Sequence, residues 1–506
     1  MGLIDAFGVI APGWTARYLM RRAELEAVRK YEAAMADNYR PRRASVGDGD
    51  LVAGLGAERL RNTARYLEEN HDLVVGILDD LVNNTIADGV RVEPMVRRRD
   101  GSLHEEFNRA IRDAYDELSE SPETTGEHSM LSLDRLAARS LFRDGEVFGQ
   151  LIRDPRFRYA TPLPFVVDML EADLCPISYN DDARSVVQGI ERDAWFAPRG
   201  YWFYKRHPAG MKAGLVIRTE DMTRRDAGAI LHPKLTKRIK QGRGVTALHA
   251  VIGRLRDVKD YEESERIAAK VASDLTGFIQ RTDGAGQIGA VRAGETKRSL
   301  KMQAGTIFEL LPGESIGTIS SDRPNTGLES FRKAMLRAVA AGTGTRGSSI
   351  SRDYDHTYSA ARQELVEGAV GYRALFGYLV GAWKRPIYQA FVEAAVLGGL
   401  VPTPRDVDMA TLYRAQFRAP ALPWIDPQKE ANAWKTLLDA ELESRAGVSR
   451  MRGVDWDAIA SEIEQEEERG FGISPAPAAP APSDQGAVDE NGDPVEDQPP
   501  ALKGAA

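Results

Sequence analysis

Ser315 lies at the centre of residues 313–317 (GESIG), which match the G-x-S-x-G pattern of serine hydrolases. In those enzymes the serine stands on a sharp turn between a strand and the helix that follows directly, with a His and an Asp supplied from elsewhere. Residues 307–311 (IFELL) can form the strand, but the residues after the motif (TISSDRPNTG) have the composition of a turn. We therefore interpret the pentapeptide as turn sequence. A serine hydrolase using Ser315 is kept as an alternative function.

Two glycine patterns, at residues 284–289 and 342–347, match the G-x-G-x-x-G signature of dinucleotide folds. That site needs a strand before the glycines and a helix after them. Both patterns follow a predicted helix instead, so we interpret them as turns. The chain has no G-x-x-x-x-G-K-[ST] sequence, which excludes a P-loop ATPase site.

Cysteine and histidine are too few and too scattered to predict a local metal site. Cys175 is the only cysteine, and a single thiol forms neither an intrachain disulfide nor a thiolate zinc site. The seven histidines include no pair at i+3 or i+4, so a metal site would have to be assembled from distant segments. We predict no catalytic residue, no metal and no cofactor.

The composition is that of a large globular chain. Of its 506 residues, 42% are hydrophobic and 28% are charged, which is enough for two or three ordinary domains, or one large elaborated domain, with buried cores. The net charge of −8 argues against a protein that grips DNA through a basic surface. No run of 18 apolar residues predicts a membrane span, and we expect no membrane contact. The apolar residues 1–14 lack a basic flank, so we interpret them as an arm or an interface segment and not as a signal peptide.

Hydrophobic periodicity divides the chain into a helical first part, a β-rich middle and a helical last part. Alternation and turn residues predict strands at 146–154, through 150–230 and again within 283–326. Helical spacing predicts one or two helices at 57–86 and further helices at 17–36, 102–118, 130–142, 246–281, 327–341, 359–397, 427–445 and 455–469, with a stop at Gly342 and a break or kink at Pro386. Residues 474–506 are rich in Pro, Ala and acidic residues, which predicts a disordered tail.

The longest predicted helix, 246–281, carries an apolar stripe at helical spacing. Fully helical, it would span about 54 Å, which is long for the core of one domain. Such a helix suits packing between copies of the chain. The stripe residues that are candidates for an inter-subunit contact are Leu248, Val251, Leu255, Val258 and Leu275.

Six stretches in a fixed order carry a more specific pattern: 60–92, 140–154 with the turn Asp144-Gly145-Glu146, 188–208, 229–279, 352–365 and 423–433. The fourth places a basic loop before the long helix, with His232, Arg238, Gln241, Arg243 and Gly244. These stretches resemble the lambda-type family of bacteriophage portal proteins, and the resemblance covers roughly residues 17–470. That family carries Asn-Tyr-Ser-Ser-x-Arg at the fifth stretch, whereas this chain has TYSAAR at 357–362. Thr357 and Ala360 replace the Asn and the second Ser of that pattern.

The resemblance implies an α+β, portal-type fold with an α/β wing, a long helical stem, a small clip and a helical crown, assembled as a ring of twelve subunits. For this chain it implies an arm at 1–19, a wing at 20–200 and 282–345, a stem and clip at 201–281, a crown with C-terminal helices at 346–473, and the tail at 474–506. It also implies a loop that projects into a channel, which we place at 312–327. The candidate channel residues are Gly313, Glu314, Ser320, Ser321, Asp322 and Arg323.

The resemblance further implies a structural protein of the virion and not an enzyme. A portal ring stands at one capsid vertex, is assembled in the cytoplasm of the host bacterium, and is the channel for packaging and ejecting double-stranded DNA. The implied partners are other copies of the chain, DNA bound without sequence preference, the terminase large subunit, the major capsid or scaffold protein, and head–tail connector proteins. The negative net charge fits a channel in which DNA slides, because few cations would hold its phosphates. A capsid scaffold or assembly protein without a channel is the second alternative.

Overall fold

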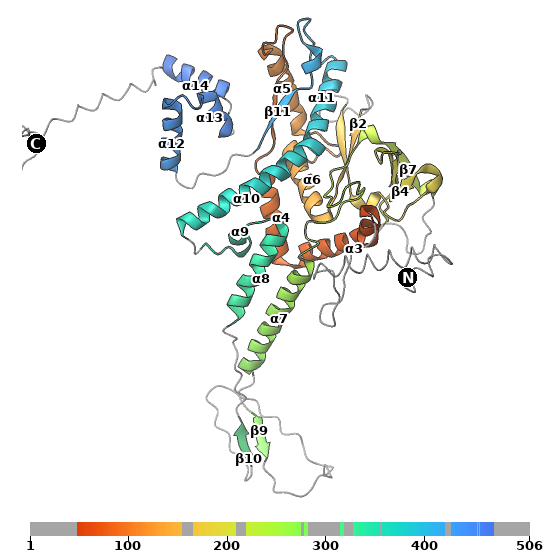
Figure 1. Cartoon of the computed structure of the whole chain (residues 1–506), viewed down its shortest axis with the longest axis vertical. Coiled ribbons are helices and arrows are strands. Elements are labelled where there is room, and N and C mark those ends of the chain that lie inside the picture. Colours follow the sequence, from red (N-terminus) through yellow and green to blue (C-terminus); the bar gives the residue numbers. More distant parts are fainter. Residues whose placement is uncertain are drawn as a thin grey trace, which may run out of the picture. The chain divides into compact units, whose positions relative to one another are not determined.

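The computed structural model describes residues 48–153, 165–208, 219–274, 278–281, 314–317, 327–354, 357–419, 427–452, 454 and 456–469. The chain divides into two compact units, Met1–Pro420 and Ala421–Ala506. Helices and antiparallel sheets occur together in the first unit (Figure 1), which confirms the predicted α+β class. The predicted arm at 1–19, the helix at 17–36 and the tail at 474–506 lie outside the described residues.

Four helices, which we call the helical core, contribute to the main core of the first unit together with later helices: α3 (Gly49–Asn70), α4 (Asp72–Thr85), α5 (Glu105–Glu120) and α6 (Met130–Asp144). The side chain of Asp48 caps α3 by accepting a hydrogen bond from the Leu51 N–H at 2.7 Å. His71 has an extended backbone and separates α3 from α4, so the region predicted at 57–86 forms parts of two helices. The helices predicted at 102–118 and 130–142 are confirmed as α5 and α6.

The β-rich middle of the chain forms two small antiparallel sheets. In one, β2 (Phe148–Ile152) lies between β3 (Val166–Leu170) and β8 (Ile230–Leu231). The other has the order β4 (Val186–Val187), β5 (Ile190–Arg192), β6 (Pro198–Tyr204) and β7 (Met222–Asp226). Their facing sides bury Phe148, Tyr201 and Phe203 in a second, smaller core. Two further strand pairs are β1 (Arg91–Pro94) with β11 (Ala415–Arg418) and β9 (Phe278–Arg281) with β10 (Glu314–Gly317).

Two helices, α7 (Ile252–Asp274) and α8 (Leu328–Thr343), lie side by side and antiparallel (Figure 1). The rings of Tyr261 and Phe331 are 4.8 Å apart, and Arg332 Nε lies 2.6 Å from Glu262 Oε1. Nearer the first turn of α7, a Cβ on Gly342 would lie 2.5 Å from a methyl carbon of Val251, so the backbone of α8 approaches closely there. The α8 prediction at 327–341 is confirmed, although the helix ends at Gly344, whose φ of 74° suits glycine, and not at Gly342.

The last helices of the first unit are α9 (Gly347–Ser351), α10 (Tyr358–Leu379) and α11 (Arg385–Leu397). A π-helical turn, Val380–Lys384, joins α10 to α11, and Pro386 is the second residue of α11. The break predicted at Pro386 is therefore a local change of helix type. The second unit contains α12 (Pro427–Asp439), α13 (Arg445–Met451) and α14 (Trp456–Glu468). The helix predicted at 455–469 is confirmed, and the one predicted at 427–445 is shorter and followed by α13.

The long helix predicted at 246–281 was wrong at both ends. Residues 247–251 form turns, because the Thr246 side chain accepts a hydrogen bond from the Leu248 N–H at 3.1 Å and so competes with a helical start. At the other end α7 stops at Asp274 and Phe278 begins β9. The helix has 23 residues, equivalent to about 35 Å.

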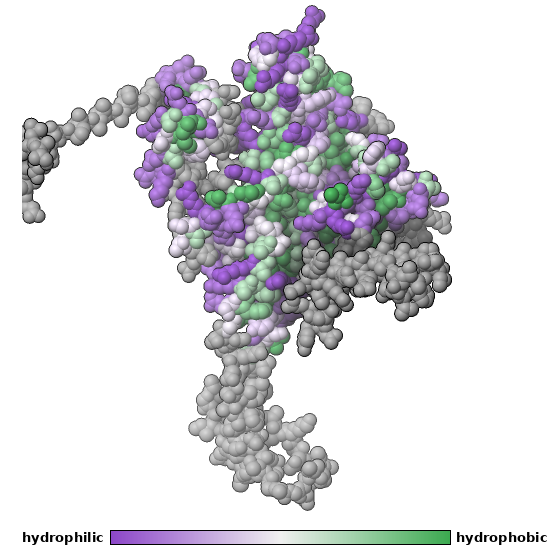
Figure 2. All heavy atoms as spheres, viewed as in Figure 1, coloured by the Kyte–Doolittle hydropathy of each residue, from purple (hydrophilic) through white to green (hydrophobic). Residues whose placement is uncertain are grey.

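Polar residues cover much of the visible surface, with apolar patches between them (Figure 2). Among the described helices, none is both long enough and apolar enough to span a membrane.

Candidate functional site

The turn after α6 and the loop before α7 cross each other at two glycines. Gly145 has a φ of 90° and ends α6, and a Cβ on it would collide with the backbone of Val245. A Cβ on Gly244 would collide with the carbonyl oxygen of Gly145. Only glycine therefore fits at either position, and the loop that leads into α7 is held against the end of α6.

Glu146, directly after this crossing, is the centre of a buried polar cluster. Arg243 Nη2 lies 2.6 Å from Glu146 Oε1, and Arg243 Nε donates to both carboxylate oxygens at 3.0 Å. The Gly244 N–H and His232 Nε2 contact Glu146 Oε2 at 2.9 and 3.0 Å. Arg61 Nη1 lies 3.4 Å from Oε1. We call Glu146, Arg243, His232, Arg61 and Gly244 the Glu146 cluster.

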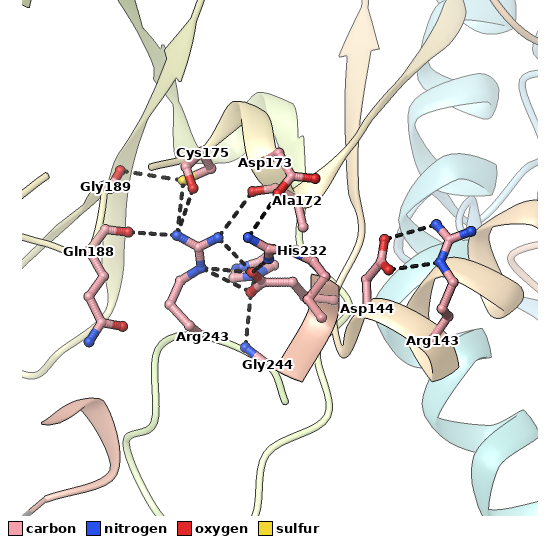
Figure 3. Close-up of polar contacts among 12 residues, drawn as sticks. Arg143, Asp144, Ala172, Asp173, Cys175, Gln188, Gly189, His232, Arg243 and Gly244 are labelled. Carbon is pink, nitrogen blue, oxygen red and sulfur yellow. Dashed lines mark hydrogen bonds and ion pairs between the residues drawn. The ribbon is translucent and has the colours of Figure 1, made fainter. Parts of the chain in front are cut away.

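Arg243 joins the cluster to the two sheets. Its Nη1 donates to the carbonyl oxygens of Cys175 and Gln188, both at 2.9 Å, and its Nη2 reaches the carbonyl oxygen of Ala172 at 3.3 Å (Figure 3). A guanidinium presents five N–H donors in a rigid plane, so it can serve a carboxylate and three carbonyls at once. One fully buried side chain thereby fixes the loop before α7 to segments around β3, β4 and β5.

The protonation states in the cluster are fixed. Burial would raise the pKa of the Glu146 carboxyl, but Arg243 and His232 outweigh burial and hold this pKa well below its usual value. Burial lowers the pKa of Arg243, and the charge of Glu146 outweighs burial and raises it. Burial lowers the pKa of His232 to about 4, although Glu146 acts in the opposite direction. His232 is therefore neutral near pH 7. Its proton lies on Nε2, because an ionised carboxylate only accepts hydrogen bonds.

These states do not suit acid–base catalysis. A general acid or base works best with a pKa near the working pH, and it must reach its substrate. Glu146 and Arg243 are fully buried and stay charged, and burial raises the pKa of the neighbouring Cys175 thiol to about 11. The cluster is therefore an anchor that positions the start of α7.

A line of alternating charges continues from the cluster along α3 and α6. Arg61, Arg65 and Glu68 are spaced at i, i+4 and i+7, so they share one face of α3. Asp173 lies 3.1 Å from Arg61 and 2.5 Å from Arg65. Farther along the line, Arg65 lies 2.7 Å from Asp144, Asp144 lies 2.8 Å from Arg143, and Arg143 lies 3.0 Å from Glu68. Each distance joins a guanidinium nitrogen to a carboxylate oxygen. Opposite charges alternate along this line, so each buried or half-buried ion has a partner.

Hydrogen bonds also hold the start of α7 directly against neighbouring helices. The backbone N–H of Ala247 donates to the carbonyl oxygen of Phe142 at 2.9 Å. His71 Nε2 contacts the carbonyl oxygen of Leu255 at 3.0 Å, and Lys259 Nζ donates to that of Asn70 at 2.7 Å. The base of α7 is thus tied to the end of α6 and to the α3–α4 junction.

The predicted stripe lies largely inside the chain. Leu248, Val251, Leu255 and Val258 are at most 1% exposed and belong to the main core of the first unit. Their burial is intramolecular, so a neighbouring copy could reach α7 only through its exposed face. The side chain of Leu275, the fifth stripe residue, lies outside the described residues.

The predicted channel residues fall mostly outside the described part of the chain. Gly313, Ser320, Ser321, Asp322 and Arg323 are not among the described residues. Glu314 lies in β10, where its backbone pairs with that of Arg281 in β9. Ser315 lies within the same strand, opposite Gln280, and not at the strand–helix turn that a hydrolase serine occupies.

Within the described part of the chain, one group of possible metal ligands comes together from distant segments: Glu171, Asp173 and His207. His207 Nε2 lies 3.2 Å from Glu171 Oε2, and both side chains are exposed. Because both carboxylate oxygens of Asp173 already contact arginines, its charge is neutralised within the protein.

From the sequence we placed His232, Arg243 and Gly244 in one basic loop region, but we did not predict their contacts with Glu146. Arg61 and Asp173 were not predicted to belong to the site. Glu146 and Arg243 are 97 residues apart in the chain, so no local spacing relates them. The usable signal was the spacing of Arg61, Arg65 and Glu68, which predicts a charged face on a helix that is otherwise packed into a core.

Comparison with known proteins places the chain in a viral context. A model of the family described as "Phage portal protein, lambda family" matches residues 35–375. A probable portal protein of Halomonas phage phiHAP-1 is 25% identical over 436 residues, which are 84% of this chain and 83% of that protein. The portal protein of Escherichia phage N15 is 23% identical over 221 residues, covering 41% of each chain. Portal protein B of Escherichia phage lambda is 23% identical over 222 residues, covering 41% of this chain and 40% of its own length.

Solved structures also align over most of the chain. A chain from the neck of an empty GTA particle aligns with 79% of this chain and 93% of its own length, at 15% identity and a TM-score of 0.47. An HK97 family phage portal protein from Corynebacterium diphtheriae aligns with 77% of this chain and 99% of its own length, at 14% identity and a TM-score of 0.30.

Proposed function

The chain belongs to the lambda family of phage portal proteins, and from that premise we propose that twelve copies close into the ring through which double-stranded DNA enters and leaves the capsid. Each copy would present one surface to the copy before it and a different surface to the copy after it. Such head-to-tail contacts close into a ring when the rotation between copies divides a full turn. The protein would then act by its shape and not by catalysis.

The observation that carries this proposal is the antiparallel pair of α7 and α8. Residues 275–327, which include β9 and β10, connect the end of α7 to the start of α8. A portal subunit has a helical stem with a small clip at its base. We propose α7 and α8 as the two stem helices and residues 275–327 as the clip, in place of the expected wing segment at 282–345.

The remaining regions follow from this assignment. We propose the helical core with the β2 and β6 sheets as the wing, and α12 to α14 as part of the crown. The Glu146 cluster would fix the stem to the wing, because it ties the loop before α7 to α3, α6 and both sheets. The channel loop at 312–327 stays a prediction, and in this arrangement it belongs to the clip.

The partners proposed for the ring follow from its place at the capsid vertex. The clip would receive the terminase large subunit during packaging and the head–tail connector proteins afterwards, and the wing would meet the major capsid or scaffold protein. The net charge of −8 per chain supports weak, sequence-independent contact with DNA. The ring would form in the cytoplasm of the host bacterium and end in the virion.

Electron microscopy of the purified full-length chain tests the ring, with the mass measured by light scattering. The expected particle has a central hole and about twelve chains of 55.7 kDa. A monomer at all concentrations would contradict the ring, and an elongated oligomer without a hole would favour the scaffold alternative. Labelling of Ser315 by a fluorophosphonate would contradict the structural role.

A further inference from the structure

Two loops that touch each other expose three large apolar side chains. Trp195 and Phe196 form the tip of the hairpin between β5 and β6 and are 84% and 50% exposed. Ile239, in the loop before α7, is 93% exposed. The loops meet where Lys240 Nζ lies 4.4 Å from the centre of the Phe196 ring, a cation–π contact. Single exposed apolar residues are ordinary, but a group of them on touching loops suggests a binding surface. We call Trp195, Phe196 and Ile239 the hairpin surface.

The exposure of these side chains does not come from loosely held loops. Asp193 Oδ1 accepts hydrogen bonds from the N–H groups of Trp195 and Ala197 at 2.8 and 2.9 Å, which close the hairpin tip. In the other loop, the buried Gln241 accepts hydrogen bonds from the N–H groups of Lys237 and Arg238 at 3.1 and 3.3 Å. Both loops are therefore preorganised, which lowers the entropy cost of binding a partner.

The backbone at the contact is also in a sparsely populated conformation. Phe196 has a φ of 69° and Lys240 a φ of 62°, and neither is glycine. Side chains rarely adopt this left-handed region unless the surrounding structure holds them there, and such residues gather at functional sites. Here the two residues in this conformation are the two that touch across the loops.

The described part of the chain begins beside this surface. A Cβ on Gly49 would lie 3.1 Å from the Cβ of Gln241 and 3.2 Å from the Cβ of Arg238. Asp50, in the same turn, accepts a hydrogen bond from the Gly242 N–H at 2.7 Å and pairs with Arg192 at 2.5 Å. The chain therefore enters the described fold at Gly49, which packs against Arg238 and Gln241. These two residues stand on either side of Ile239 and Lys240 in the sequence.

We propose that the hairpin surface is the docking site of the apolar N-terminal segment of the same chain, residues 1–14. This segment (MGLIDAFGVIAPGW) holds Leu3, Ile4, Phe7, Ile10 and Trp14, and Asp5 is its one charged side chain. Its apolar groups match the exposed Trp195 and Ile239, and Asp5 would meet the cations of Lys237, Arg238 and Lys240. Attachment to α3 through residues 15–47 gives the segment a high effective concentration at the surface. The proposal does not rest on ring formation.

Crosslinking between introduced cysteines tests the contact. The native Cys175 is fully buried and its thiol pKa is raised to about 11, so it stays inert under mild oxidation. The test protein is the full chain with Phe7→Cys and Ile239→Cys. Its matched control carries Phe7→Cys and Val370→Cys, because Val370 is also apolar and 69% exposed but lies on α10. The first pair should form an intrachain disulfide at least about tenfold faster than the control pair, seen as a mobility shift on a non-reducing gel.

A second measurement follows the surface itself. Trp195 emission, taken as the difference between the chain and its Trp195→Phe variant, should be quenched more strongly by iodide once residues 1–14 are deleted. Equal disulfide rates for the two cysteine pairs would overturn the proposal. A disulfide product with the mass of two chains would also overturn it. So would an Ile239→Cys thiol that is protected from alkylation by double-stranded DNA but is not protected by residues 1–14. The intrachain disulfide and the quenching of Trp195 do not depend on ring formation, so their failure is distinct from a failure to form rings.

Discussion

Arg243 Nη2 lies 2.6 Å from Glu146 Oε1, and both side chains are fully buried. Removing one partner of such a pair leaves the other charge buried without compensation. We expect Arg243→Met to lower the free energy of unfolding by about 3–5 kcal/mol, measured by urea denaturation. The control, Arg224→Met, breaks the exposed pair with Glu191 and should cost less than about 1 kcal/mol. Similar losses in the two variants would mean that the Glu146 cluster is not an anchor.

The crossing of Gly145 and Gly244 makes a second prediction. Gly244→Ala places a Cβ against the carbonyl oxygen of Gly145, where the backbone must move, so we expect a clear fall in the midpoint of thermal unfolding. Gly253→Ala is the control, because a Cβ there meets nothing within 4 Å and α7 gains helix propensity. Its midpoint should stay the same or rise. A Gly244→Ala chain as stable as the wild type would show that the loop can shift freely.

Stability should fall as the pH is lowered through the range in which His232 titrates. Burial lowers its pKa from 6.5 to about 4, so between these values the unfolded chain binds a proton that the folded chain does not. The stability owed to neutral His232 is thus fully present above pH 6.5 and is lost as the pH falls toward 4. The lowered pKa of Glu146 adds a loss in the same direction below its ordinary value of 4.5.

Urea denaturation across this pH range measures the effect. His232→Gln keeps a side-chain N–H donor but does not titrate, so its free energy of unfolding should fall less between pH 6.5 and pH 4 than that of the wild type. His128→Gln, at a half-buried position away from the cluster, should keep the wild-type decline. If His232→Gln declined as steeply as the wild type, another group would carry the pH dependence.

The buried stripe on α7 predicts a folding defect that precedes assembly. Leu255→Asp puts a carboxylate at a position with no exposure, which costs several kcal/mol when the charge is unpaired. We expect an unfolded or aggregated chain by circular dichroism. Ile267→Asp, on the exposed face of the same helix, should fold normally. A folded, monomeric Leu255→Asp chain would instead place this side chain between subunits.

The channel assignment is tested in an infectious phage. Adding positive charge at Ser320→Lys together with Ser321→Lys should hold DNA phosphates and lower the packaging yield. Ring assembly, followed by electron microscopy, should be unchanged. Ser320→Ala with Ser321→Ala is the control for the loss of the hydroxyls and should package normally. Normal packaging by the lysine variant, or rings that fail to form, would move the narrow part of the channel elsewhere.

Local patterns predicted elements well where one helix buries one face. The apolar spacing of α5, α6 and α8 identified all three helices, because that spacing directly reflects burial. The end of α7 was missed because Phe278 and Ile279 continue the helical pattern and yet form β9. Short apolar runs do not separate strand from helix.

The Glu146 cluster was beyond prediction for a different reason. Its members come from α3, the turn after α6, the end of β8 and the loop before α7. Each charge is stable in the core only because the others are there, so their burial is a property of the assembled fold and not of any segment. In the sequence, a single Arg or Glu is expected at the surface, because these residue types are rarely fully buried.

The π-helical turn at Val380–Lys384 has a consequence for comparing this chain with its relatives. Such a turn holds one residue more than an α-helical turn, and each added residue rotates the rest of the helix by about 100°. Within the turn, Trp383 packs over Gly149 and Lys384 Nζ lies 2.5 Å from Asp134 Oδ2. The turn therefore acts as a one-residue insertion that sets the phase of α11. In an alignment, a relative with a regular helix at this place should show a single-residue gap near 380–384, and its counterparts of Gly149 and Asp134 should differ as well.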